Sequence, residues 1–121
     1  MARASDAEID ELRTAVNAAL EATEARLLAL RREFDEIVES GSLTNTDDEH
    51  DPDGATIAYE RARTAALLTQ AGQDIDRLRR SLDRLDDGDY GLCRSCGQFI
   101  GVERLRAQPT AEQCIACARA G

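Results

Sequence analysis

Residues 9–37 read IDELRTAVNAALEATEARLLALRREFDEI and contain the pattern that decides the fold. Apolar side chains recur in this stretch every three or four residues, and Thr23 fills the one gap. The apolar positions are Ile9, Leu12, Val16, Leu20, Leu27, Leu30, Phe34 and Ile37. Because this spacing keeps one apolar stripe along one side of an α-helix, it predicts a coiled-coil helix over about residues 5–40.

The two ends of this helix also carry sequence signals. Ser5 and Glu8 have the spacing of a capping box, in which each side chain accepts a hydrogen bond from a free backbone N–H at the start of the helix. Gly41 is expected to end the helix in a left-handed conformation, which glycine adopts at little cost.

A second apolar stripe runs to the helix-breaking sequence Asp86-Asp87-Gly88-Asp89. Its positions are Ala58, Ala65, Leu68, Ala71, Ile75, Leu78, Leu82 and Leu85. Two such stripes joined by a short connection predict an antiparallel hairpin, in which facing residue numbers add to about 95. Residues 5–88 are therefore expected to form a long coiled-coil hairpin with a tip loop at 41–54, and Pro52 suits the first position of the second helix.

Charge and hydropathy exclude several classes of protein. The chain has 15 Arg, no Lys and 24 acidic residues, and its formal net charge is −9. This balance argues against a protein that coats nucleic acid, because phosphate binding requires clustered cations. No apolar run is long enough to span a bilayer, and no hydrophobic signal segment follows Met1. We therefore expect a cytoplasmic protein that does not bind membranes.

The expected tip loop concentrates the negative charge. Residues 47–53 contain five carboxylates and no cation: Asp47, Asp48, Glu49, Asp51 and Asp53. An anionic point at the end of a hairpin suits a basic cavity or a site that contains Mg²⁺, because charge attraction assists docking. The alternative is a solvated loop without a partner.

All four cysteines lie near the end of the sequence in two C-x2-C pairs, Cys93 with Cys96 and Cys114 with Cys117. Zn²⁺ prefers four tetrahedral ligands, and a two-residue spacer lets both thiolates of one turn reach the same ion. The pattern predicts one structural zinc ion in a small finger at residues 89–121, with Gly97 permitting the tight backbone after Cys96. Residues 99–102 are expected to form a short hairpin strand between the two pairs.

The finger segment also carries a family resemblance. It reads Asp89-Tyr-Gly-Leu-Cys-Arg-Ser-Cys-Gly97, continues as Ile100-Gly-Val-Glu-Arg-Leu-Arg-Ala-Gln-Pro-Thr-Ala111, and closes with Cys114-Ile-Ala-Cys117. This run resembles the DksA/TraR family of bacterial zinc-finger proteins, including the 17-residue spacer between Cys96 and Cys114. The preceding hairpin matches that family in order and length, so the resemblance covers most of the chain.

Members of the family bind bacterial RNA polymerase rather than DNA. The resemblance implies that the coiled coil enters the secondary channel of the polymerase and that its tip acts near the active site. The family's tip motif is D-x-x-D-x-A, and its second Asp and its Ala fall on Asp53 and Ala55. The first Asp falls on His50, which departs from the motif, and Asp51 offers a carboxylate beside it. The expected tip contacts are therefore His50, Asp51, Asp53 and Ala55, although Asp53 alone also fits a helix cap.

The finger is expected to contribute a second contact surface. Arg104 falls in a stretch that is basic in the family, and Arg106 lies close to it, so both are expected to contact a protein partner. Solvated arginine is the alternative. Direct sequence-specific DNA binding is not expected, because the charge of −2 on a zinc tetrathiolate offsets the small cationic excess of the finger side chains.

The sequence therefore predicts a non-enzymatic transcription regulator that binds RNA polymerase as a monomer. The runner-up is a zinc-bearing coiled-coil adaptor for another protein, which the departure at His50 favours. A redox-active thiol protein is third, because C-x-x-C also serves in disulfide exchange, and oxidative zinc release would couple the finger to a stress response.

Overall fold

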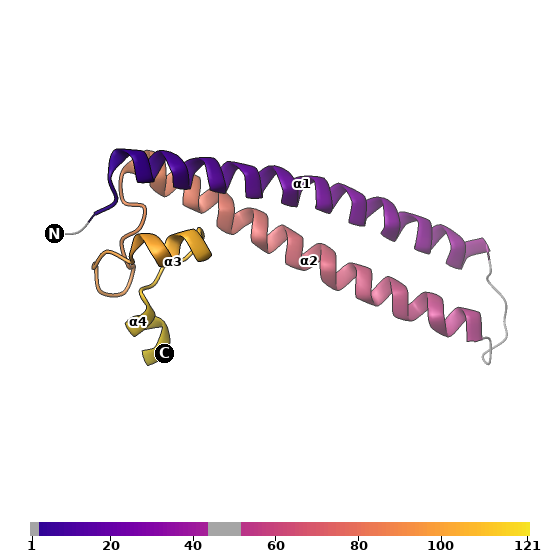
Figure 1. Ribbon diagram of the computed structural model, residues 1–121. Helices are drawn as coiled ribbons and strands as arrows, with labels where there is room; N and C mark the ends of the chain where they lie inside the picture. The colour runs from indigo at the N-terminus through magenta and orange to yellow at the C-terminus, as the bar shows by residue number, and fades with distance from the viewer. Residues whose placement is uncertain (1–2, 44–51) are drawn as a thin grey trace. The chain divides into compact units, whose positions relative to one another are not determined.

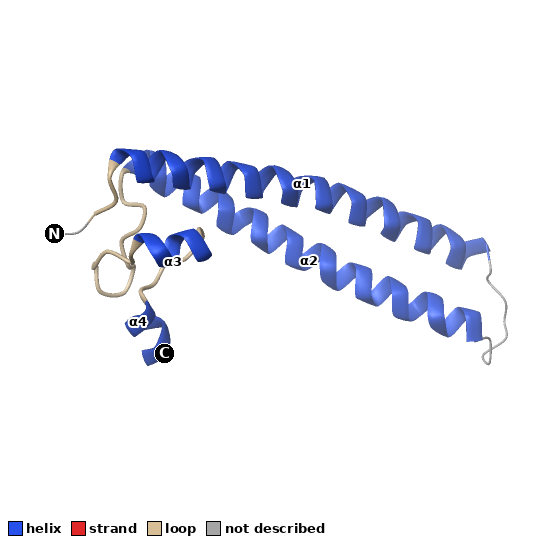
Figure 2. Cartoon of the chain, in the orientation of Figure 1, coloured by secondary structure: helices blue, strands red, loops and turns tan. Residues whose placement is uncertain are grey.

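A computed structural model describes residues 3–43 and 52–121, with side chains for residues 3–41 and 54–121. Two long helices, α1 (Asp6–Leu43) and α2 (Pro52–Asp87), precede two short ones, α3 (Val102–Ala107) and α4 (Ile115–Ala120) (Figure 1). The described residues contain no β-strand, only an isolated antiparallel bridge between Leu92 and Phe99 (Figure 2). The prediction of a mainly helical chain with a helical hairpin is confirmed.

The chain packs as two compact units, each of which takes part of α1 and part of α2. The finger unit consists of Met1–Glu21 and Ile75–Gly121, and the hairpin unit consists of Ala22–Asp74. Within each unit the segment of α1 runs antiparallel to the segment of α2 (Figure 1). The predicted boundary between residues 88 and 89 stays a prediction, since these units divide the chain by packing rather than by motif.

Helix α1 begins with the predicted capping box. The Ser5 N–H donates to Glu8 Oε1 at 2.8 Å, and the Glu8 N–H donates to Ser5 Oγ at 3.1 Å. These bonds satisfy two N–H groups that have no partner inside the helix. The Ser5 N–H and hydroxyl also hold the pKa of the Glu8 carboxyl below its ordinary value, because both bonds favour its ionised form.

The expected end of α1 at Gly41 is wrong. Helix α1 continues to Leu43, and Gly41 is absent from the glycines with positive φ. A Cβ atom at Gly41 would stand 3.5 Å from Ile57 Cγ2 of α2, so this glycine faces the partner helix instead of capping its own. At the other end of the connection, Pro52 is the first residue of α2, as predicted. Both helices extend into the expected tip loop 41–54.

The seam of the hairpin unit follows the predicted stripe on α1 and departs from it on α2. Leu30 is buried, and Leu27, Phe34 and Ile37 are half-buried. On α2, Ala58 is exposed, whereas Ile57 is half-buried and Thr64 is buried. The buried stripe on α2 is therefore displaced by one residue at its start. The sequence does not predict this shift, because alanines occur on several faces of the helix and their small side chains do not indicate which face is buried.

Two contacts report how α1 and α2 pair. Gly41 faces Ile57 in the hairpin unit, and Arg13 Nη1 lies 2.8 Å from Asp86 Oδ1 in the finger unit. Each pair lies about one helical turn from the pairing expected from the sequence. The pairing of the individual apolar residues of α1 with those of α2 stays a prediction.

The finger unit holds the main apolar core. Its buried residues form one cluster contributed by both long helices and the finger: Leu12, Val16, Leu78, Leu85, Tyr90, Cys93, Ile100 and Leu105. Leu105 of α3 is fully buried, and the side chain of Cys93 belongs to the same cluster. The finger therefore packs on the helix ends through apolar burial as well as through its cysteines.

Helix α2 ends where the breaker sequence predicts. Gly88 has a φ of +83°, and the N–H groups of Asp89 and Tyr90 both donate to the carbonyl of Arg84 at 3.1 Å. This αL ending satisfies a carbonyl of the last turn and turns the chain into the finger. No helix in the described part of the chain has the length and hydropathy that a membrane span requires.

Candidate metal centre

The first C-x2-C pair lies in a tight turn. The Gly97 N–H donates to the carbonyl of Cys93 at 2.8 Å, and the Cys93 N–H donates to the carbonyl of Gln98 at 2.7 Å. Gly97 has a φ of +77°, which confirms that a residue able to adopt this conformation is needed after Cys96. The turn places Cys93 in the core and leaves Cys96 exposed.

The second pair lies at the start of α4. Cys114 is the N-cap residue, and its Sγ accepts a hydrogen bond from the Cys117 N–H at 3.4 Å. The Ala118 N–H donates to the Cys114 carbonyl at 2.9 Å. A cysteine at the N-cap and another on the first turn thus present both sulfur atoms on one side of a short helix.

The four thiols converge on one point. The Sγ atoms of Cys93, Cys96, Cys114 and Cys117 all lie within 4.8 Å of one another, and Cys96 Sγ is 3.8 Å from Cys114 Sγ. Tetrahedral zinc with Zn–S bonds of about 2.3 Å separates its sulfur ligands by about 3.8 Å. The cluster therefore fits one structural Zn²⁺ with four cysteine ligands, as predicted.

The protonation of the thiols is consistent with a cation site. Hydrogen bonding from the Cys114 backbone, the largest contribution, lowers the pKa of Cys93 to about 6. Hydrogen bonding with the neighbouring sulfur atoms, Cys114 first, raises the pKa of Cys117 to about 12, and the charge of Cys114 makes a smaller contribution. Four thiolates at this distance need a compensating cation, and zinc binding would release the protons that remain.

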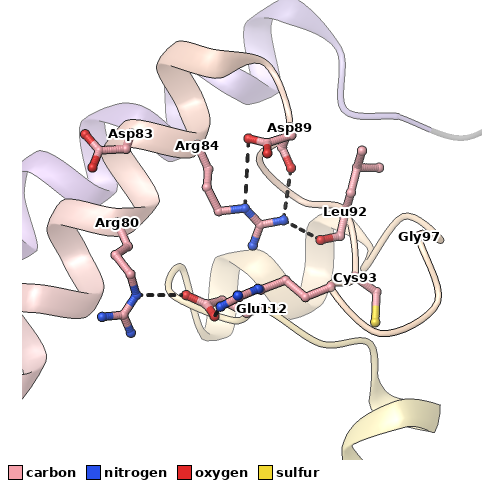
Figure 3. Close-up of a pocket in the computed structure, with 9 residues that line it drawn as sticks. Arg80, Asp83, Arg84, Asp89, Leu92, Cys93, Gly97 and Glu112 are labelled. Atoms are coloured by element: carbon pink, nitrogen blue, oxygen red, sulfur yellow. Dashed lines mark hydrogen bonds and ion pairs between the residues drawn. The ribbon is translucent and has the colours of Figure 1, made fainter.

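Two arginines of α2, Arg80 and Arg84, bind groups of the finger near Cys93 (Figure 3). Arg84 Nη2 donates to the carbonyl of Asp89 at 3.0 Å and to the carbonyl of Leu92, the residue before Cys93. Arg80 Nε lies 3.3 Å from Glu112 Oε1, and Glu112 Oε2 accepts from Arg94 Nη1 at 2.7 Å. The hydrogen bond from the Arg94 side chain, assisted by Arg80, lowers the pKa of Glu112, and burial opposes this shift.

These groups line a pocket of about 550 Å³ between α2 and the first cysteine turn. Figure 3 shows how their side chains lie in it. Arg84 bonds two carbonyls that precede the first cysteine turn, and Glu112, in the segment before Cys114, is bound by Arg80 and Arg94. Neither Arg84 nor Glu112 is among the site residues predicted from the sequence. No motif indicates that an arginine at the end of α2 bonds carbonyls of the finger, because the signal is three-dimensional.

The expected strand at 99–102 is wrong. Phe99 makes a single bridge with Leu92, and Val102 already begins α3. The helix carries Leu105 into the core, and Tyr90 donates its hydroxyl hydrogen to the carbonyl of Pro109 at 2.7 Å. Burial raises the pKa of Tyr90 to about 12. The spacer between the cysteine pairs therefore forms a helix that packs inward rather than the expected strand.

The two expected contact arginines of the finger both have partners within the chain. Arg104 Nε donates to the Gln113 carbonyl at 3.0 Å. Arg106 binds Glu11 of α1 with two nitrogens, at 2.7 and 3.2 Å, and also binds Glu103 at 2.9 Å. These bonds hold both side chains on the finger unit. Their contact with another protein stays a prediction.

Most of the expected tip contacts lie outside what the structure describes. His50 and Asp51 are outside the described residues, and Asp53 is placed only as the second residue of α2. Ala55 is exposed in the first turns of that helix. The role of all four in partner binding stays a prediction.

Residues 88–120 match the family model described as "Prokaryotic dksA/traR C4-type zinc finger". The matched segment contains all four converging cysteines. The solved structure of transcription factor DksA2 from Pseudomonas aeruginosa superposes with a TM-score of 0.81 at 27% identity, over 96% of this chain and 84% of that chain. The finger of this chain is of the DksA/TraR type.

Curated relatives align over different lengths. The RNA polymerase-binding transcription factor DksA of Haemophilus influenzae is 34% identical over 90 residues, which are 69% of this chain and 62% of that protein. The Escherichia coli protein of the same name is 46% identical over 43 residues, 36% of this chain and 28% of that protein. The alignments thus span less than two thirds of the length of these curated relatives.

Proposed function

We propose that this protein is a non-enzymatic transcription regulator of the DksA/TraR family that binds RNA polymerase in the cytoplasm as a monomer. One observation carries the proposal: the order of helical hairpin and four-cysteine finger matches a transcription factor structure over 96% of the chain. The named function of the DksA relatives, which is RNA polymerase binding, gives the partner. Size-exclusion chromatography with light scattering tests whether the protein is a monomer in solution.

The hairpin supplies the element for insertion into the secondary channel. Helices α1 and α2 contain 38 and 36 residues, and the connection between them is strongly acidic. Carboxylates at its end suit a channel that leads to a Mg²⁺-dependent active site, because negative groups are attracted to such a cavity. In this proposal Asp51 and Asp53 provide the charge, Ala55 provides close contact, and His50 weakens the effect relative to an Asp.

The finger supplies a second contact surface in the same proposal. The Arg104 guanidinium is held by one carbonyl, and the Arg106 guanidinium is bound by carboxylates, so both side chains have fixed positions on the finger unit. Fixed arginines lose less conformational freedom on binding than mobile ones. They would therefore position the finger on the polymerase while the hairpin enters the channel.

A pull-down with core RNA polymerase tests the proposal, using the unmodified protein and two tip variants, Asp53→Asn and Asp51→Asn. Glu33→Gln, which removes one charge from an exposed position of α1, serves as the matched control. We expect the unmodified and control proteins to be retained. The tip variants are expected to lose their effect on promoter-complex lifetime more strongly than they lose retention.

The competing function is a zinc-bearing adaptor for another protein, and the histidine at position 50 is the observation that favours it. His50→Asp restores the family motif and separates the two functions. Stronger polymerase regulation by His50→Asp supports the proposed function. If neither the unmodified protein nor His50→Asp binds core polymerase, the adaptor is the correct reading.

A further inference from the structure

Four residues outside the ligand set join the two cysteine pairs of the finger. Arg94 and Ser95 lie between the cysteines of the first pair, and Glu112 and Gln113 directly precede the second. The Arg94 N–H donates to the Glu112 carbonyl at 2.8 Å, and Arg94 Nη1 donates to Glu112 Oε2 at 2.7 Å. Gln113 Nε2 donates to Ser95 Oγ at 2.8 Å. These four residues form an inter-pair network that does not use the sulfur atoms.

Glu112 also connects the inter-pair network to α2. Its other carboxylate oxygen, Oε1, lies 3.3 Å from Arg80 Nε, and Figure 3 shows this ion pair. The Glu112 side chain is 23% exposed, whereas those of Arg80 and Arg94 are 53% and 65% exposed. A single exposed ion pair contributes little, but a carboxylate mostly shielded from water and shared by two arginines is held in one position. Glu112 therefore bonds both the first cysteine turn and α2 from the segment that leads into the second pair.

The distance between the two pairs is the part of the site that local structure leaves open. Each C-x2-C turn sets the separation of its own two sulfur atoms, but 17 residues lie between Cys96 and Cys114. Their Sγ atoms are nevertheless 3.8 Å apart, although neighbouring thiolates repel one another. The inter-pair network spans the same junction, so it holds the pairs together from outside the ligand set.

We propose that Glu112 is a positioning residue of the metal centre: through Arg94 and Arg80 it holds the two cysteine pairs at the separation that one Zn²⁺ requires. Glu112 acts through the two turns and is not itself a ligand. Release of the ion requires its sulfur ligands to separate in steps, and a pair that stays nearby rebinds at a high effective concentration. The network should therefore slow zinc release. This inference holds whichever partner the protein binds.

Zinc release from the full zinc-loaded chain tests the inference, with an excess of a chromogenic chelator reporting the dissociation rate. We expect Glu112→Gln to raise this rate about tenfold, the lower end of the effect of outer-shell residues on metal affinity, because Gln has one acceptor oxygen and no charge. Glu103→Gln is the matched control. Its carboxylate also binds a finger arginine, Arg106, at 2.9 Å, but it lies outside the network. The control should release zinc at the unmodified rate.

A double-mutant cycle separates positioning from general stability. The Arg94 side chain is largely exposed, so Arg94→Gln should fold and keeps the test decisive if Glu112→Gln does not. We expect Arg94→Gln to accelerate zinc release less than Glu112→Gln does, because the Arg80 ion pair remains. The double variant should release zinc no faster than Glu112→Gln alone, because both changes remove the same bond.

The proposal is overturned if Glu112→Gln and Glu103→Gln release zinc at the same rate, or if the two fold-changes of the cycle multiply in the double variant. Leu105→Ala gives the reference for a purely structural loss, because Leu105 is fully buried in the finger core and outside the network. Acceleration by Glu112→Gln should exceed that by Leu105→Ala when each is compared with its loss of stability in urea. An equal or smaller ratio would also overturn the positioning role.

Discussion

The finger unit and the hairpin unit use the same two helices and are stabilised differently. The finger unit buries eight side chains in one cluster and brings four thiols together. Among its described residues, the hairpin unit buries only Leu30, Thr64 and Ala71. Because stability follows buried apolar area and metal binding, the finger unit should be the more rigid of the two. The stability of the hairpin unit should depend more on the intrinsic stability of its two helices.

Zinc removal is expected to give the largest difference between the two units, because structural zinc contributes about 10–16 kcal/mol of apparent binding free energy in finger peptides. Excess chelator should abolish amide protection at residues 89–120 while most helical signal of the hairpin unit persists in circular dichroism. Restoring Zn²⁺ should restore protection, which is the control. Full protection of the finger in chelator would show that apolar packing alone holds it.

Matched leucine truncations measure the two cores directly. Leu105 is fully buried in the finger unit, and Leu30 is 8% exposed in the hairpin unit. We expect Leu105→Ala to cost about 3–5 kcal/mol and Leu30→Ala to cost about 2 kcal/mol, because the denser core leaves the larger cavity. Segment-resolved denaturant unfolding checks both values. Equal losses would mean that the hairpin seam is as well packed as the finger core.

A glycine pair sharpens the account of packing inside the finger unit. Gly88 and Gly91 have φ values of +83° and +87°, so alanine is strained at both. A Cβ atom at Gly91 would also stand 3.1 Å from Phe99 Cε1 and 3.2 Å from Leu105 Cδ1, whereas at Gly88 it would meet nothing within 4 Å. Gly88→Ala should cost about 1 kcal/mol, and Gly91→Ala about 2–4 kcal/mol. Thermal unfolding that ranks the two variants in the opposite order would exclude this account.

Acid gives the smallest expected effect, and it is local to the start of α1 in the finger unit. The pKa of Glu8 is lowered in the folded chain, so its contribution to stability is present above its ordinary value of 4.5 and is lost as pH falls through the lower, folded value. Amide exchange at Ser5 and Glu8 should therefore accelerate, relative to intrinsic rates, below about pH 4.5. Glu8→Gln keeps an acceptor and should remove this pH dependence. A pH-independent Ser5 amide in the unmodified protein would contradict the capping role.

The sequence predicted the parts of the fold that local rules control. The capping box of Ser5 and Glu8, Pro52 at the start of α2 and the zinc ligands all follow from short-range spacing. Gly41 shows the limit of such rules, because its place is decided by contact with Ile57 rather than by its own backbone preference. The apolar pattern places Ala58 in the seam, but this residue is exposed, because alanine is compatible with every face of a helix.

Long-range side-chain contacts account for most of what the sequence left open in the finger. Arg84 and Glu112 resemble ordinary surface charges in the sequence, and only the folded chain brings them to carbonyls and to other side chains near the cysteines. The sequence predicts a strand at 99–102 because Phe99, Ile100 and Val102 are all good strand formers, but only Phe99 makes a bridge and Val102 begins α3.

The two tyrosines give the molecule an optical reporter for each unit. The chain has two Tyr and no Trp. Tyr90 is buried in the finger unit and bonded to Pro109, whereas Tyr59 is 71% exposed in the hairpin unit. The near-ultraviolet spectrum therefore contains one phenol held in a fixed chiral environment and one in water. Loss of near-ultraviolet circular dichroism would follow the opening of the finger through Tyr90, without any added dye or label.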